Sequence, residues 1–98
     1  MATKRYVLLE SDGDVSETVH DLAEFLGKRF GAMKIIEIKG NPFAVILKTT
    51  NLVAEQLKEI RDGFAVGGMN FVPVLTSGAV GNLKRRAAEA MANGKVHE

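Results

Sequence analysis

The feature that most constrains the fold of this chain is the order in which its hydrophobic periodicity changes. Residues 4–10 form an apolar run without strict alternation, as in a strand covered on both faces. Apolar residues then recur at helical spacing between Asp14 and Gly31, where a capping-box pattern opens the helix and a glycine ends it. Two β-rich runs follow at 33–39 and 43–49, on either side of a turn containing glycine and proline. The first half of the chain therefore predicts a strand, a helix and a β-hairpin.

The second half of the chain continues to alternate between helical and strand-like patterns. Its predicted segments are a helix over 51–64 capped by Asn51, a strand over 69–76 after Gly67-Gly68, a helix that begins at Ser77 and fades at Asn93-Gly94, and a loose tail over 95–98. The last helix carries its apolar residues on one stripe, as expected of a helix that packs on one side only.

This order, βαββαβ followed by one extra helix, is the pattern of the ferredoxin-like and RNA-recognition folds. It predicts one α+β domain over residues 1–98, with a four-stranded antiparallel sheet in the order 4-1-3-2. The first and third strands are then central, which agrees with their apolar residues on both faces. The second and fourth are edges, where Pro73 and the charges of Lys34 and Glu37 would discourage further pairing.

The composition limits the classes of function. Thirteen Lys and Arg stand against 12 Asp and Glu, and the resulting net charge of +1 is far from the strongly basic balance of many nucleic-acid binders. The absence of cysteine excludes thiol catalysis, iron–sulfur clusters and zinc ribbons. No apolar run approaches the ~20 residues that cross a bilayer, and the start lacks the apolar core of a secretion signal. A cytoplasmic protein without membrane contact is expected.

The sequence offers little for metal or enzyme chemistry. Asp12-Gly13-Asp14 begins like a calcium loop, but its glycine is in the wrong position and further oxygen ligands are out of register. His20 and His97 are not spaced as metal ligands, and no nucleophile elbow, P-loop or dinucleotide fingerprint is present. We therefore expect no catalytic residue, metal site or cofactor in the chain itself.

The fold class raises the question of RNA readout on a sheet face, where aromatic residues of the two central strands stack bases. Tyr6 stands on the first strand, but Ala44, Val45 and Ile46 fill the aromatic positions of the third. Aliphatic side chains suit packing better than stacking, so this face is expected to be covered by the third helix or by a partner protein.

The segment TSGAVGNLKRR, residues 76–86, places a hydroxyl and two glycines ahead of three cations. Free N–H groups and the positive end of the dipole at a helix start favour an anion, and Lys84, Arg85 and Arg86 surround the first two turns of the predicted helix. Charge is also segregated, because residues 12–24 hold five carboxylates and no Lys or Arg. Two interpretations stay open, a phosphate-binding surface and a solvated amphipathic helix.

Several short motifs carry a resemblance to a known family. They are Arg5-Tyr6-Val7, Phe30-Gly31, the apolar run that ends before Asn51, and Val74-Leu75-Thr76-Ser77-Gly78 leading into Leu83-Lys84-Arg85-Arg86. On these motifs the chain, from about Lys4 to Ala88, resembles archaeal ribonuclease P protein component 2, in a family shared with a subunit of eukaryotic ribonuclease P and MRP. It departs from that family at Ala79, where Thr is typical, and in lacking the basic extensions of many relatives.

The resemblance implies a non-catalytic, RNA-binding role in tRNA processing within a ribonucleoprotein. The catalytic RNA, with Mg²⁺ bound by the RNA, removes 5′ leaders from precursor tRNA, while this protein and a larger ribonuclease P protein subunit stabilise the RNA fold. Ser77, Gly78, Lys84, Arg85 and Arg86 are then expected to contact RNA phosphates. Weaker candidates are Lys4, Arg5 and Tyr6.

A rival interpretation comes from a different class of function. A ferredoxin-like regulatory or scaffolding domain would homodimerise through its sheet and bind a small ligand or a protein, without RNA. The near-neutral charge and the aliphatic second face of the predicted sheet favour it.

Overall fold

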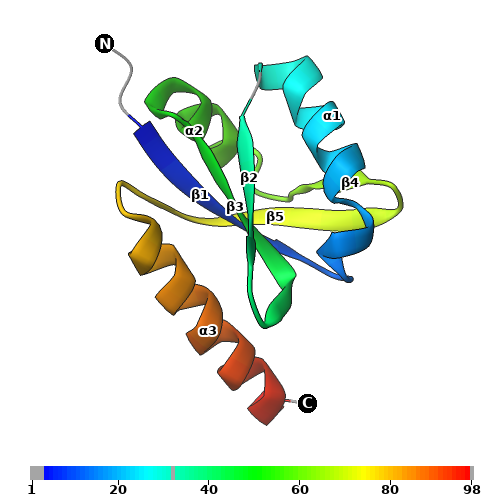
Figure 1. The fold of residues 1–98 in the computed structure, drawn as a ribbon, viewed down its shortest axis with the longest axis vertical. Helices are drawn as coiled ribbons and strands as arrows, with labels where there is room; N and C mark the ends of the chain where they lie inside the picture. The colour runs from blue at the N-terminus through cyan, green and yellow to red at the C-terminus, as the bar shows by residue number, and fades with distance from the viewer. Residues whose placement is uncertain (1–3, 32, 98) are drawn as a thin grey trace.

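The computed structural model describes the backbone of residues 4–31 and 33–97 and the side chains as far as Ala88 (Figure 1). Its elements are β1 (Lys4–Ser11), the 3₁₀ turn η1 (Val15–Glu17), α1 (Val19–Phe30), β2 (Lys34–Ile38), β3 (Asn41–Thr50), α2 (Asn51–Lys58), β4 (Phe64–Val66), β5 (Met69–Ser77) and α3 (Val80–His97). Each predicted strand and helix is therefore present, and one strand is additional.

The sheet is antiparallel and five-stranded, in the order β2-β3-β1-β5-β4. The predicted α+β class is confirmed, whereas the prediction of a four-stranded sheet is wrong. The strands β3 and β1 are central, and β4 adds a short strand outside β5. Because β4 pairs only with residues 69–71, β5 has a free outer edge from residue 72 onward.

The extra strand replaces the end of the helix predicted over 51–64. The helix α2 ends at Lys58, and Phe64 begins β4 opposite Phe71. The rings of Phe25 and Phe71 stack on Phe64, with centroids 5.4 and 5.8 Å away. Phe64 thus reaches the core that its helical spacing predicted, but from a strand. The turn at Gly67-Gly68 has both φ angles positive, 59° and 80°, as a two-residue hairpin requires.

Three predicted helix ends differ in detail from the structure. Asp14 does open the first helical segment, but as the cap of the 3₁₀ turn η1, in which its Oδ1 accepts a hydrogen bond from the Ser16 N–H at 2.9 Å. Thr50 rather than Asn51 caps α2, because Thr50 Oγ1 accepts from the Val53 N–H at 3.3 Å. The backbone of 95–97 continues α3 instead of forming a loose tail, since one glycine costs a helix only ~1 kcal/mol. Glu98, the end of that predicted tail, lies outside the described residues.

Two apolar cores lie on the two faces of the sheet. The helices α1 and α2 cover one face, where Val7, Leu9 and Phe71 are buried. The helix α3 lies on the opposite side (Figure 1), and its Leu83 and Ala87 are buried against residues of β1 and β3. The expectation that the third helix covers the second sheet face is confirmed for this part of α3.

One glycine is held in place by two independent constraints. Gly63 has a φ of +83°, and a Cβ added there would lie 2.3 Å from the carbonyl oxygen of Phe71. Gly40 also has a φ of +83°, but a Cβ there meets nothing within 4 Å. Gly63→Ala is therefore expected to lower the free energy of unfolding by more than about 2 kcal/mol, and Gly40→Ala by about 1 kcal/mol. Urea denaturation measures both, and equal losses would contradict the structure.

A pair of hydrogen bonds fastens the β4–β5 hairpin to the end of β1. The Asn70 backbone N–H, at 3.0 Å, and its side-chain amide, at 2.8 Å, both donate to the Asp12 carboxylate and hold the pKa of Asp12 below its ordinary value of 3.8. A folded-state pKa below the unfolded one stabilises the fold above pH 3.8, and this stabilisation is lost as the pH falls through the folded value.

The expected result is an acid-induced fall in the thermal unfolding midpoint that begins below about pH 4. Asp12→Asn removes the titrating group, so its midpoint should fall less steeply with pH over the same window. Asp14 also has a lowered pKa, through its hydrogen bonds with Ser16, and contributes to the fall that the variant retains. Superimposable pH profiles for wild type and variant would show that the Asp12 contacts do not stabilise the fold.

Candidate nucleic-acid interface

The corner between β5 and α3 carries the Ser77-Gly78 motif. Ser77 ends β5 and is half-buried, while Gly78 is exposed, so the corner is accessible. Ser77 Oγ accepts hydrogen bonds from the Ala79 N–H at 3.1 Å and from the Asn82 side-chain amide at 3.4 Å. The helix itself begins at Val80, so the prediction that Ser77 is its cap is wrong. Ser77 instead orders the turn that leads into the helix.

The amides at this helix start are not all free for an anion. Ser77 engages the N–H of Ala79, and the N–H of Asn82 donates to the Ala79 carbonyl at 3.3 Å. A phosphate would therefore rely more on the surrounding cations than on a full set of free N–H groups. The side chains around the corner therefore decide whether it can hold a phosphate.

Two of the weaker sequence candidates lie directly at the corner. Tyr6 is the register partner of Ser77 across the β1–β5 ladder. The guanidinium of Arg5 lies against the glycine, with Nη1 3.1 Å from the position that a Cβ of Gly78 would take. Lys4 is exposed at the start of β1, opposite Thr50 of β3. The structure thus places Arg5 and Tyr6 beside Ser77 and Gly78.

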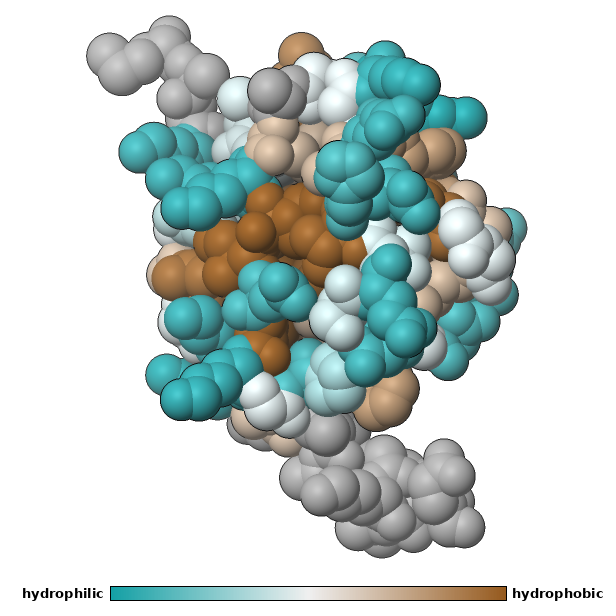
Figure 2. Space-filling view, turned by 45° about the vertical axis from the view of Figure 1, so that its right-hand side comes forward, coloured by the Kyte–Doolittle hydropathy of each residue, from teal (hydrophilic) through white to brown (hydrophobic). Residues whose placement is uncertain are grey.

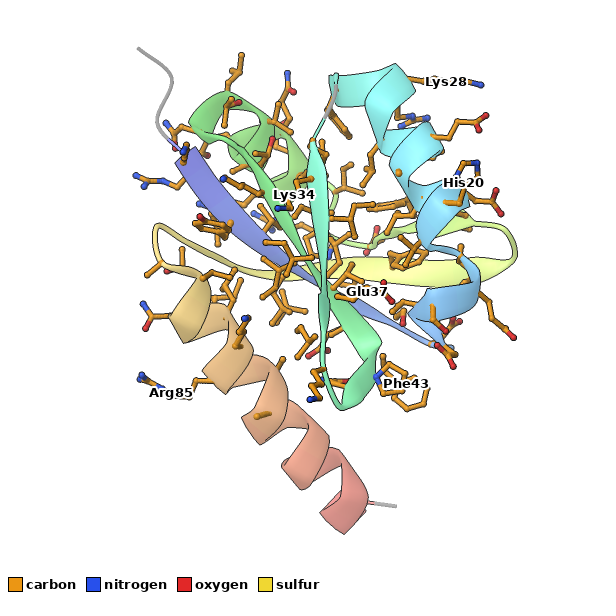
Figure 3. The ribbon with its side chains drawn as sticks, viewed as in Figure 1. His20, Lys28, Lys34, Glu37, Phe43 and Arg85 are labelled. Carbon is orange, nitrogen blue, oxygen red and sulfur yellow. The ribbon has the colours of Figure 1, made fainter. Side chains whose placement is uncertain are left out.

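The register of the sheet places further cations next to Tyr6. Tyr6 is opposite Lys48 on β3, and Lys48 is opposite Lys34 on β2. Directly opposed residues of antiparallel strands point to the same face. Tyr6 packs against the core that α3 covers, which includes Leu8, Ile46 and Leu83 and which we call the α3-side cluster. Tyr6, Lys48 and Lys34 therefore lie on the face that α3 occupies. Ser77, Tyr6, Lys48 and Lys34 form one row across four strands, which we call the basic row. Lys34 stands on β2 in the middle of the molecule (Figure 3).

The sequence did not identify the basic row. The sequence pattern explains Lys34 only as a charge that protects an edge strand, and it does not single out Lys48. The alternation along each strand does indicate which face the three side chains share. Tyr6, Lys34 and Lys48 each lie an even number of residues from an apolar residue of the α3-side cluster in the same strand. The sequence does not give the register of the two ladders, and it is this register that places the three residues side by side.

The three cations of α3 do not share one direction. All three are exposed, while Leu83, just before them, and Ala87, just after them, are buried against the sheet. At ~100° per residue, Lys84 and Arg86 lie on either side of that buried stripe. Arg85 lies on the outer surface of the helix and points away from the sheet (Figure 3). The structure therefore brings Lys84 and Arg86 to the borders of the α3–sheet contact and leaves Arg85 outside it.

The charges of this surface are not neutralised by carboxylates. Among the described side chains, the ion pairs are Lys28 with Glu24 at 3.2 Å and Lys58 with Glu55 at 3.9 Å, and neither involves the basic row or α3. The acidic residues of α1 lie on the opposite side of the sheet from α3 (Figure 1). The acidic residues that cluster between positions 12 and 24 of the sequence thus lie away from the α3 cations.

In the described part of the chain, no group of three or more His, Asp or Glu residues could hold a metal ion. His20 lies exposed on α1 (Figure 3). None of the helices over residues 4–31 and 33–97 combines the length and the apolar character that a bilayer span needs.

The chain was compared with protein-family models, with curated proteins and with solved structures, and none of the three comparisons found a match.

Proposed function

We propose that this protein binds RNA along the basic row and the adjoining start of α3. The observation that carries the proposal is the placement of Ser77, Tyr6, Lys48 and Lys34 in one line across the sheet, next to the Ser77-Gly78 corner. The two lysines supply charge for phosphates, and Ser77 adds a hydroxyl at one end of the line.

The chemistry of this surface favours contact with the RNA backbone over base readout. Tyr6 is only half-exposed and packs against the α3-side cluster, so its ring has little free face for a base. Lys side chains act as mobile point charges, which suit phosphates without fixing a sequence. Binding of this kind is driven largely by release of counterions and weakens as salt rises.

The finer assignments rest on the resemblance of the sequence. We propose that the sheet is a ferredoxin-like sheet extended by β4, and that the protein is a subunit of ribonuclease P. In that role the RNA, with its own Mg²⁺, cleaves the precursor tRNA, and the residues of this chain only position the RNA. A larger protein subunit would be the partner, and the complex would act in the cytoplasm. The accessible Ser77-Gly78 corner and the unpaired cations of α3 support this proposal.

The test is a titration of ribonuclease P RNA with wild type and with the triple variant K84A/R85A/R86A over a series of salt concentrations. Wild type should bind with a steep salt dependence, and the triple variant should bind more weakly with a smaller slope. An unchanged slope would reject the α3 cations as phosphate contacts. Precursor-tRNA cleavage reconstituted with and without the protein then tests the ribonuclease P role, which an absence of stimulation would contradict.

A second candidate function is a regulatory or scaffolding domain that homodimerises. Two observations favour it, the position of β2 at an open edge of the sheet and an apolar area ringed by hydrophilic side chains (Figure 2). Sedimentation equilibrium distinguishes the two functions. A dimer that ignores RNA would favour the scaffolding role, and a monomer that binds RNA would exclude it.

A further inference from the structure

A hollow of about 470 Å³ lies along the free edge of β5, and none of its lining residues belongs to the basic row. Lys58, at the end of α2, and Arg61, in the loop that follows, line it together with residues 73–76 of β5. Both cations are exposed, and none of the described lining residues is a carboxylate. The contact of Lys58 with Glu55, at 3.9 Å between solvated groups, is too weak to neutralise it.

An open strand edge could accept either an extended peptide or a nucleic acid, and the local backbone decides against the peptide. The N–H and C=O of Asn70 face Asp12 on the β1 side. Because these groups alternate along a strand, the nitrogen of Pro73 faces the free edge, where it has no hydrogen to donate. The register also shifts between Leu8 and Leu9, opposite Leu75 and Pro73, as at a β-bulge. Both features discourage strand addition.

The remaining features of the hollow suit a nucleotide. Two cations can hold a phosphate, and the surface of Pro73, Val74 and Leu75 offers an apolar wall for a ribose or base. Leu75 is 41% exposed, which is unusual for a leucine in the middle of a strand and leaves it available for contact. The hollow reaches Thr76, the neighbour of Ser77 at the end of the basic row, and its far end at Pro73 lies ~13 Å from Ser77, estimated from four residues of strand.

Arg5 lies near the end of β5, between the basic row and the hollow. Its neighbour in sequence, Tyr6, belongs to the basic row, and successive residues of a strand point to opposite faces. The guanidinium of Arg5 nevertheless reaches Gly78, where β5 has ended and the chain turns toward α3. A backbone that rounds the end of β5 would therefore meet a cation before it enters the hollow.

We propose that single-stranded RNA held on the basic row continues around the end of β5 into this hollow, where Lys58 and Arg61 bind its phosphates. The inference rests on the proposed RNA-binding function and extends it from the α3 face of the sheet to the free edge of β5. It assigns a role to two residues that lie outside the α3 motif.

The test compares two double variants that remove the same charge. K58A/R61A removes the cations of the hollow, and K28A/K39A removes exposed lysines of α1 and of the β2–β3 turn. Each is titrated with an oligouridylate of about 12 nucleotides over a series of salt concentrations. K58A/R61A should lower the salt slope by about 1.4 and the affinity about tenfold, because each contact with a single strand contributes ~0.7 to the slope. K28A/K39A should bind as wild type does.

The possible outcomes separate this inference from the function on which it rests. If wild type binds no RNA, the proposed function fails and the inference with it. If wild type binds but K58A/R61A matches K28A/K39A, only the inference fails. If K58A/R61A keeps its affinity for RNA but loses binding of polyglutamate shown by wild type, the hollow is a site for acidic peptides and the RNA path is overturned.

A reporter in the hollow gives a readout independent of affinity. The chain contains no Trp, so Leu75→Trp introduces a single indole at the exposed position beside the two cations. Oligouridylate should quench this indole at concentrations that occupy the basic row. Leu52→Trp, at a 69% exposed position on α2, is the matched control and should not respond. Equal responses of the two indoles, or none from either, would overturn the proposed path.

Discussion

Changing Lys34 and Lys48 together to Ala is expected to weaken RNA binding about tenfold and to lower the salt slope for a single strand by about 1.4. The reason is geometric, because the register sets these two lysines beside Tyr6 on one face of the sheet. Arg85→Ala should leave both quantities close to those of wild type, since Arg85 points away from that face. Fluorescence anisotropy with labelled oligouridylate at several salt concentrations measures both variants.

Comparing K34A/K48A with Arg85→Ala tests whether RNA contacts the residues aligned by the sheet register or the consecutive cations of α3. Residues 84–86 are consecutive cations, so the motif alone gives Arg85 the same importance as its neighbours. The charge-matched control K28A/K39A reports any effect of net charge on binding. A larger loss from Arg85→Ala than from K34A/K48A would show that RNA follows the outer surface of α3 instead of the basic row.

Phe71→Ala is expected to lower the free energy of unfolding by about 3–5 kcal/mol, the largest stability effect that we predict for a single substitution. Phe71 is fully buried, and its ring stacks on Phe64 with centroids 5.8 Å apart. Removing the ring leaves a cavity between β5 and the helices α1 and α2, and Phe64 loses one of the two rings that stack on it. For a domain whose total stability is about 5–15 kcal/mol, this loss approaches the limit of folding.

Phe43→Ala is the matched control, because Phe43 is 47% exposed, and its ring points outward beside the β2–β3 turn (Figure 3). Its expected effect is within about 0.5 kcal/mol. If Phe71→Ala does not fold, Phe71→Leu keeps most of the volume and should cost less than half as much. Urea denaturation followed by circular dichroism compares all three, and similar costs for Phe71→Ala and Phe43→Ala would contradict the described core.

The sequence predicted those parts of the fold that depend on local periodicity. The strands around the central apolar runs and the three helices follow from repeats that persist over several residues. The strand β4 was missed because it has three residues, and because Phe64 also fits the helical spacing of Leu57 and Ile60. The cap of α2 was misplaced by one residue, since Thr50 and Asn51 can each accept the same kind of hydrogen bond.

The candidate site was predictable only where its residues are neighbours in the sequence. Ser77, Gly78 and the α3 cations form one motif, and the structure leaves them accessible as expected. The β1–β3 ladder places Lys48 beside Tyr6, and the β2–β3 ladder places Lys34 beside Lys48. A shift of one residue in the first ladder would move Lys48 to the other face, and a shift in the second would move Lys34. Lys58 and Arg61 depend on where α2 ends, which the misplaced helix end concealed.

The adjacency of Arg5 and Tyr6 on β1 has a mechanical consequence. Both residues belong to a central strand that is hydrogen-bonded on each side, so neither can shift without disturbing β3 and β5. RNA that passes around the end of β5 would contact two consecutive residues that point to opposite faces, so the thickness of the sheet sets the distance between the two contacts. Contact with both residues would require no movement of the strand that carries them.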